Sequence, residues 1–288
     1  MTNKRIYNLL SVIIITIFIA HGCVKYAVRS STGFLTNISE SIFEECDPLL
    51  ARKSIPANLK LLEGVLKSDP ENPEILRLLS MGFCGYSMLF VEKDDPERAS
   101  DLYFRAFKYG LKAMKYRGSP NEIDLEKAKE LLSGYGRKNS GIYLWTTVSW
   151  NLWINNNLDK PSAVSQIGSA RIFIDRIAES DPEIFYGLPY VMKAVSLSAR
   201  SPLLGGDYEK AEHFFKKAVD VSGGDFFLPV YYYARYYCVG TQKRELFISL
   251  LNEIINADSK RLPGVCLINR VIQGKAKTLL DEIDEYFF

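Results

Sequence analysis

The 288-residue chain is poor in histidine and has no recognisable catalytic motif. Only His213 follows the N-terminal apolar segment, so a zinc site that needs several histidine ligands cannot form. We interpret His213 as a residue on a partly exposed helix face and not as a catalytic base. The motifs of serine hydrolases, P-loop proteins and zinc metalloproteases are absent as well. The sequence therefore predicts no catalytic residue, no metal site, no cofactor and no enzymatic activity.

A surplus of positive charge is also lacking. The chain has 36 basic and 34 acidic residues, and removal of an N-terminal segment that contains Lys4 and Arg5 leaves 34 of each. Nucleic acids are bound by clustered positive charge, which such a balanced sequence does not supply. The composition therefore argues against nucleic acid as a partner.

The alternating apolar and polar pattern of β-strands is absent, and helix signals take its place. Asp95-Pro96-Glu97 combines a capping carboxylate, a proline for the first helical turn and an acid near the positive helix end. Asn72-Pro73-Glu74 repeats this arrangement. Gly205-Gly206-Asp207 forms a tight turn that ends in a cap, and an amphipathic run from 208 to 221 follows it. A last amphipathic run extends from Val265 to the C-terminus. We expect about ten to twelve helices and essentially no sheet.

One segment of the chain recurs 112 residues later. Ser68-Asp69-Pro70-Glu71 is repeated as Ser180-Asp181-Pro182-Glu183. At the same offset a stripe of small, aromatic and small residues also recurs, as Ala99, Tyr103, Ala106 and as Ala211, Phe215, Ala218. The spacing i, i+4, i+7 places each triplet on one helix face, where small residues let a second helix approach. Tetratricopeptide (TPR) helix pairs use this pattern on their second helix.

Two weaker echoes of the stripe occur, at Ala57/Leu61/Gly64 and at Ala163/Ile167/Ala170. The four stripes begin 42, 64 and 48 residues apart, which differs from the regular TPR period of about 34. We therefore predict an all-α fold, built from irregular TPR-like helix pairs that form a compact right-handed α-solenoid-like domain.

The N-terminal segment resembles a bacterial lipoprotein signal peptide. Lys4 and Arg5 precede an apolar stretch over residues 9–20, which Gly22 and Cys23 follow. In such signals the cysteine after the cleavage site becomes the acylated first residue of the mature chain, which is Cys23 here. The apolar stretch is shorter than the roughly 20 residues that span a membrane, and an uncleaved anchor helix is the alternative.

Residues around Cys23 refine this interpretation. A lipoprotein signal usually has leucine three residues before the cysteine and a small residue two before it, where Ala20 and His21 stand here. Val24, in place of aspartate, resembles lipoproteins sorted to the outer membrane. We expect a lipid-anchored protein of the bacterial periplasm, at the outer membrane more than the inner. The expected divisions are a signal peptide over 1–22, a tether over 23–40 and a single helical domain over 41–288.

Four further cysteines, Cys46, Cys84, Cys238 and Cys266, have spacings that resemble no zinc site. An oxidising periplasm permits one disulfide among them, but buried free cysteines are favoured.

Aromatic residues gather in two regions. Tyr143, Trp145, Trp150 and Trp153 lie within eleven residues, and a second group includes Tyr233 and Tyr237. One interpretation is that these rings fill the core between irregular helix pairs. The other is that all six line a cleft, where amphipathic rings orient an organic ligand. Both interpretations stay open, and the six residues are the candidate ligand site.

The chain outside the signal peptide resembles the TatT family, the TPR-like lipoprotein T components associated with TRAP (tripartite ATP-independent periplasmic) transporters. The block Pro202-Leu203-Leu204-Gly205-Gly206-Asp207 before the second strong stripe is the most specific point of resemblance. The other matching segments are Asp47-Pro48, Pro56-Ala57-Asn58-Leu59, Leu61-Leu62-Glu63-Gly64, Asp69-Pro70, Gly82-Phe83-Cys84-Gly85-Tyr86, Asp95-Pro96-Glu97-Arg98-Ala99, Trp150-Asn151-Leu152-Trp153-Ile154, Leu267-Ile268-Asn269-Arg270 and Lys275-Ala276-Lys277-Thr278-Leu279-Leu280.

This resemblance implies an all-helical accessory protein of the cell envelope that docks a periplasmic solute-binding protein and can hold a small organic or hydrophobic ligand. The solute-binding protein would carry small organic solutes, often acids, to a membrane permease. A homo-oligomer is compatible with the assignment, and the resemblance transfers no catalytic motif. The alternative is a TPR-like envelope scaffold lipoprotein that mediates protein–protein assembly and holds no small ligand.

Overall fold

The structure is a computed structural model that describes residues 32–200, 203 and 205–287. Cys23, the signal peptide expected over 1–22 and the first part of the expected tether lie outside the described residues. Helix α2 begins at Thr32, inside the segment 23–40 that was assigned to the tether. Ile42 and Phe43 at its end pack against the core.

All regular elements among the described residues are helices, and no strand occurs among them. They are α2 (Thr32–Glu44), α3 (Pro48–Leu66), α4 (Pro73–Phe90), α5 (Pro96–Ala113), α6 (Leu125–Ser133), η1 (Arg137–Asn139), α7 (Ser140–Asn155), α8 (Pro161–Val164), α9 (Ile167–Ser180), α10 (Ile184–Ser198), α11 (Tyr208–Val221), α12 (Phe227–Tyr232), the π-helical η3 (Tyr233–Cys238), α13 (Arg244–Asn256), η4 (Pro263–Val265), α14 (Cys266–Asp281) and η5 (Ile283–Glu285). The prediction of an all-α fold is confirmed.

Local side-chain chemistry explains where the long helices begin. The carboxylates of Asp95 and Asp207 accept hydrogen bonds from the backbone N–H of the third residue of α5 and of α11, each at 3.0 Å. Asn72 caps α4 by accepting from the N–H groups of Glu74 and Ile75. These three caps were predicted from the sequence and are confirmed.

All residues of the two strong stripes are completely buried. Ala99, Tyr103 and Ala106 on α5 are fully buried, and so are their counterparts on α11. At Ala99 the helices come close enough for the Ser87 hydroxyl of α4 to donate to the Ala99 carbonyl, 3.1 Å away. Each stripe belongs to the second helix of a pair, because α4 packs against α5 and α10 against α11.

The two weaker echoes have different outcomes. In α3 the stripe is wrong: Ala57 is exposed and Leu61 is 64% exposed, because Ile55 and Leu59 face the core instead. Ala163 and Ala170 are buried, but they belong to α8 and α9, so no single helix carries that stripe.

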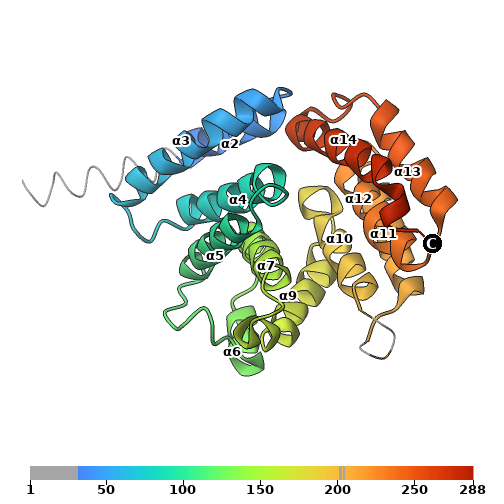
Figure 1. The fold of residues 1–288 in the computed structure, drawn as a ribbon. Helices are drawn as coiled ribbons and strands as arrows, with labels where there is room; N and C mark the ends of the chain where they lie inside the picture. Colours follow the sequence, from blue (N-terminus) through green and yellow to red (C-terminus); the bar gives the residue numbers. More distant parts are fainter. Residues whose placement is uncertain (1–31, 201–202, 204, 288) are drawn as a thin grey trace, which may run out of the picture.

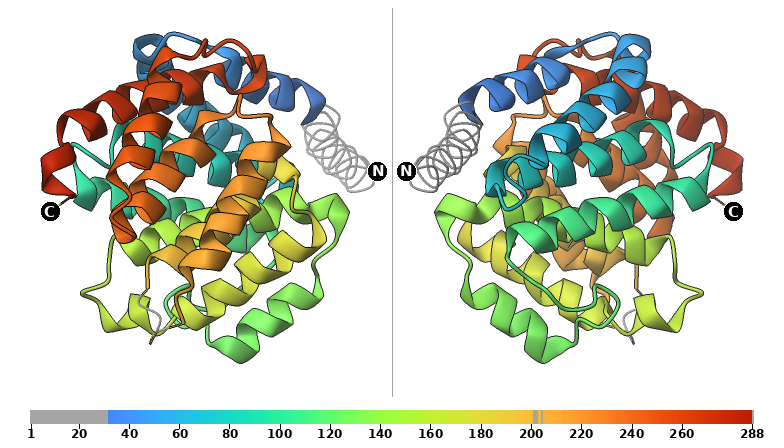
Figure 2. Two further views of the ribbon diagram at one scale, coloured as in Figure 1. Left: turned by 90° about the vertical axis from the view of Figure 1, so that its right-hand side faces the viewer. Right: turned by 90° about the vertical axis from the view of Figure 1, so that its left-hand side faces the viewer.

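The helices follow one another around the molecule, from α3 through α6 to α14 (Figure 1). The last helix returns to the first ones, since α14 packs against α2 and α3. Both views of Figure 2 show these blue and red helices side by side. The Lys275 ammonium on α14 also donates to the Met88 carbonyl of α4 at 2.7 Å. The described helices therefore form a closed circuit, and the right-handed solenoid arrangement stays a prediction.

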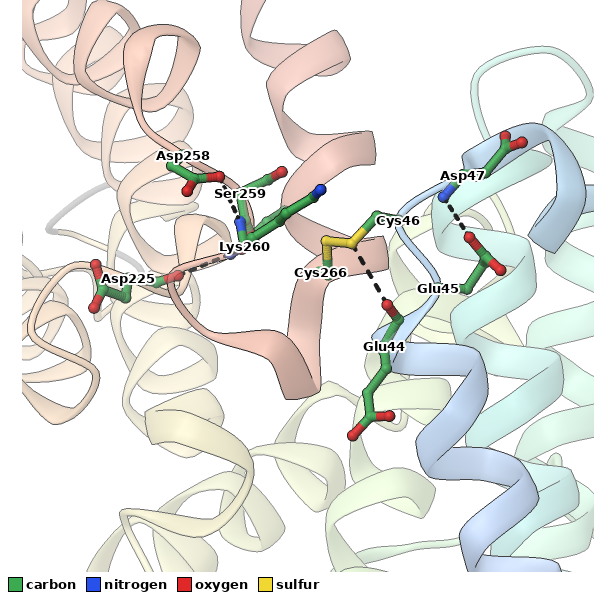
Figure 3. Close-up of a disulfide and its surroundings, with 10 residues drawn as sticks. Glu44, Glu45, Cys46, Asp47, Asp225, Asp258, Ser259, Lys260 and Cys266 are labelled. Atoms are coloured by element: carbon green, nitrogen blue, oxygen red, sulfur yellow. Dashed lines mark hydrogen bonds between the residues drawn. A yellow bond between two sulfur atoms is a disulfide. The ribbon is translucent and has the colours of Figure 1, made fainter.

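A disulfide joins the two ends of this circuit. Cys46, just after α2, is bonded to Cys266, the first residue of α14, across 220 residues of sequence (Figure 3). Cys84 and Cys238 are free and buried, and burial raises the pKa of the Cys238 thiol to about 12. The preference for four free cysteines is therefore corrected for Cys46 and Cys266, because the closed circuit brings residues distant in sequence together.

Candidate functional site: an apolar cavity along helix α10

A cavity of about 240 Å³ lies between α7, α9 and α10, with further walls from α2, α4, α12, η3 and α14. Helix α10 lines it with Leu188, Val191, Met192, Val195 and Ser196, and Ala199 and Arg200 continue the lining just after the helix. These positions are three or four residues apart, the spacing of one helix face. Leu188 and Ser196 are eight positions apart, which corresponds to about 12 Å along the helix.

The end of the cavity near the start of α10 is aromatic. The ring of Phe185 lies 4.9 Å from that of Trp145 on α7 and 5.6 Å from that of Phe43 on α2, both edge-to-face. Such pairs stabilise beyond the area that they bury. Three rings from three helices therefore close this end.

An unusual backbone turn presents Phe185 to the cavity. Phe185, Tyr186 and Gly187 have φ values of 48°, 56° and 82°, in the left-handed region that bulky side chains rarely adopt. Gly187 is the residue suited to this conformation, and a side chain there would also contact Val221 of α11 at 3.2 Å. The aromatic rings around this turn and helix α11 pack closely against it, and this packing holds the turn in its left-handed conformation. Strained backbone of this kind occurs more often at functional sites.

The other end of the cavity is cationic. Arg171 of α9 and Arg200, just after α10, both line it, together with Ser196. The Arg200 guanidinium donates to the Ser196 hydroxyl at 2.5 Å. Burial, and next the positive charge of Arg171, hold the pKa of Arg200 below its ordinary value. The cavity therefore changes from aromatic to positively charged along α10.

Two tyrosines form part of the wall that α12 and η3 supply. Tyr232 and Tyr236 both line the cavity, and the Tyr232 hydroxyl lies 3.7 Å from the Met88 sulfur. Burial raises the pKa of both phenols, so they are neutral at ordinary pH. This wall can offer hydroxyl groups but no negative charge.

The structure places the six predicted aromatic residues in different settings. Trp145 lines the cavity. Trp150 is fully buried; it stacks on Phe107 at 5.0 Å and its indole N–H donates to Gln166 at 3.0 Å. Tyr143 donates to the Leu131 carbonyl at 2.8 Å.

The other three also pack away from the cavity lining. Trp153 lies against Phe104, with ring centroids 5.0 Å apart. Tyr233 and Tyr237 both donate to the Glu212 carboxylate, at 3.0 and 2.5 Å. In the described part of the chain, then, one member of the predicted set lines the cavity and five fill the core around it.

Sequence reasoning missed Phe43, Phe185, Arg171 and Arg200. They come from α2, α9 and the two ends of α10, and only the tertiary fold brings them together. One local signal was available: the face of α10 is apolar up to Val195 and polar from Ser196. Whether this change marks a binding site depends on which face of α10 points into the protein, and the sequence does not show which face that is.

Two neighbouring cavities share walls with this one. One, of about 200 Å³, lies between α2, α3 and α4 and shares Phe43, Gly85 and Leu89 with it. Another, of about 380 Å³, shares Phe43, Trp145 and Phe185. Phe43 thus borders all three.

His213 is exposed on α11, as predicted. Within residues 32–200, 203 and 205–287, no group of three or more His, Cys, Asp or Glu side chains is placed to hold a metal ion. None of the helices described there has the length and apolar character that a membrane crossing requires.

Comparison with known proteins gives one family. The model of the TRAP transporter T-component family matches residues 44–287, which is most of the chain and includes the whole circuit from α3 to η5. No curated protein matches the chain.

Proposed function

Because the chain belongs to the TRAP transporter T-component family, we propose that it is a membrane-anchored periplasmic accessory protein that docks a solute-binding protein and holds a small organic or hydrophobic ligand. Membership of the family makes it a component of a transport system. Docking, the ligand and the lipid anchor at Cys23 are our proposals, as is the location at the outer membrane.

The cavity along α10 is the observation that supports ligand binding. Apolar side chains supply most of its walls and the polar groups among them are few, an arrangement typical of small-molecule sites. Trp145, Phe43 and Phe185 are the aromatic contacts that we assign to the ligand, and Trp150 is assigned to the core.

The test of ligand binding fills the cavity with a side chain. Val195 is half-buried and lines the cavity, so the indole of Val195→Trp would occupy it. Val164→Trp, on the exposed surface of α8, is the matched control. Calorimetric titration of the full chain in lipid nanodiscs with decanoate and with decanol is expected to show binding to wild type and to the control, and none to Val195→Trp.

Docking is tested separately. The full chain is expected to bind the solute-binding protein of the same transport system, and Val195→Trp is expected to leave that affinity unchanged. If no apolar compound binds the wild-type chain while the solute-binding protein does, the scaffold alternative replaces the ligand carrier. Failure of the solute-binding protein to bind would contradict docking itself.

The anchor has its own test, which is independent of the cavity. Mass spectrometry of the mature N-terminus is expected to show a diacylglyceryl group on Cys23. An intact Met1 or an unmodified first residue would overturn that proposal and favour the uncleaved anchor helix.

A further inference from the structure

The cationic end of the cavity has more positive than negative charge. Arg171, Lys193 and Arg200 lie around Asp175. Among the described residues, Asp175 is the one carboxylate that forms an ion pair with any of these three side chains. Lys193 forms a close ion pair with Asp175, while the Arg171 Nε is 4.0 Å from it. Arg200 has its hydrogen bond with the neutral Ser196 hydroxyl.

The excess of positive charge lies at the proposed ligand site. Lys193, which holds Asp175 most closely, is outside the lining, while Arg171 and Arg200 are part of it. Two partly buried guanidiniums of like charge repel each other, and an anion between them would remove the repulsion. Guanidinium groups also match the two oxygens of a carboxylate or phosphate in a bidentate arrangement.

Away from the two arginines, the lining that α10 supplies is apolar. From Leu188 to Val195 the lining face of α10 is entirely apolar, and Trp145 and Val148 of α7 also line this part. This apolar stretch of α10 is about 10 Å long, and an extended alkyl chain can lie along it with its head group at the arginines.

We infer that the ligand is a single-chain anionic amphiphile, with its acidic head group between Arg171 and Arg200 and its apolar chain along α10 toward Trp145 and Phe185. This inference rests on the proposed ligand-binding function and adds the chemical class and the orientation. A carboxylate and a phosphate monoester share the chemistry that the two arginines recognise.

The experiment compares head groups on one chain length. The full chain in lipid nanodiscs is titrated by calorimetry with decanoate, decyl phosphate, decanol and decylamine, with empty nanodiscs as the blank. The test variant is Arg171→Gln/Arg200→Gln. The control is Arg176→Gln, on the same helix but stacked over Tyr135 away from the cavity. Circular dichroism and the thermal midpoint verify that the variants fold.

At least one of the two anions is expected to bind wild type about tenfold or more tightly than decanol, and the double variant is expected to lose that advantage. Decanol should bind the wild type and both variants alike. Which anion binds more tightly distinguishes a carboxylate ligand from a phosphate ligand.

Other outcomes separate the two proposals. Equal binding of decanol and both anions, or anion binding that the double variant leaves unchanged, would overturn the head-group assignment while the cavity stays a ligand site. Tighter binding of decylamine would overturn it as well. If none of the four compounds binds wild type, the ligand-binding part of the proposed function fails together with the inference.

Discussion

The helix pairs α4–α5 and α10–α11 are repeats of one another, yet their two helices have diverged to different extents. The second helices, α5 and α11, keep the same cap, the same acid after it and the same buried stripe. The first helices differ where they face the cavity. At the 112-residue offset Met88 of α4 corresponds to Arg200 after α10, and both line the cavity. In each pair the second helix keeps the buried packing stripe, while the first helix lines the cavity with residues that differ between the two pairs.

The largest expected effect concerns the centre of each stripe. Tyr103→Ala and Phe215→Ala each remove a fully buried ring and should each destabilise the fold by about 3–5 kcal/mol. Urea unfolding followed by circular dichroism measures both. Similar losses would support the equivalence of α5 and α11, and a loss below about 1 kcal/mol in either would break it.

A smaller effect is expected from overpacking the small residues. Ala99→Leu and Ala211→Leu add a branched side chain where two helices touch, and each should cost roughly 1–3 kcal/mol. Ala57→Leu is the matched control, because the α3 echo has the same spacing but faces solvent. Its unfolding free energy should stay within about 0.5 kcal/mol of wild type. Wild-type stability in either stripe variant would show that the buried spacing is a coincidence.

The smallest effect concerns a position where the two second helices differ. Glu212 of α11 corresponds to Ser100 of α5. Hydrogen bonds from Lys216 and then Tyr237 lower the pKa of Glu212 to about 2, against the cost of partial burial. Because the pKa is lower in the folded state, this stabilisation is present above about pH 4.5 and is lost as the pH falls toward 2.

Glu212→Gln measures that contribution. The variant should be less stable than wild type at pH 7 by no more than about 1 kcal/mol, since solvent screens the pair with Lys216. The difference in unfolding free energy should shrink between pH 4.5 and pH 2. Glu130→Gln, exposed on α6, is the control and should show no comparable change. A difference that is constant with pH would mean that the carboxylate charge is not what stabilises α11.

Much of the fold could be predicted because its signals are local. The caps at Asn72, Asp95 and Asp207 each bond to an N–H two or three residues away, so their spacing in the sequence is already their geometry. The stripe at Ala99 and its counterpart at Ala211 stood out because both lie in a longer repeat. The same spacing at Ala57 gave a wrong prediction, since spacing alone does not show which face of a helix is buried.

The candidate site was less predictable because its parts are distant in sequence. Aromatic density led to Trp145, but it also selected Trp150, whose hydrogen bond to Gln166 is satisfied inside the core. Phe185 reaches the cavity through a left-handed turn that no simple pattern marks. Arg171 and Arg200 come together only when α9 packs against α10. Sequence patterns thus identified helices and repeats, while the identity of the lining depended on the tertiary fold.

The bond between Cys46 and Cys266 has a mechanical consequence for a protein that is proposed to be held at one end. A pulling force that enters the chain before Cys46 passes directly through the sulfur atoms into α14. The 219 residues between the two cysteines form a closed loop in parallel with that bond, so helices α3 to α13 need bear none of the load. Tension on the N-terminal side would act on α2, which lines two of the cavities from Phe34 and Thr36 onward and carries near its end Phe43, three residues before the bond and at the border of all three cavities.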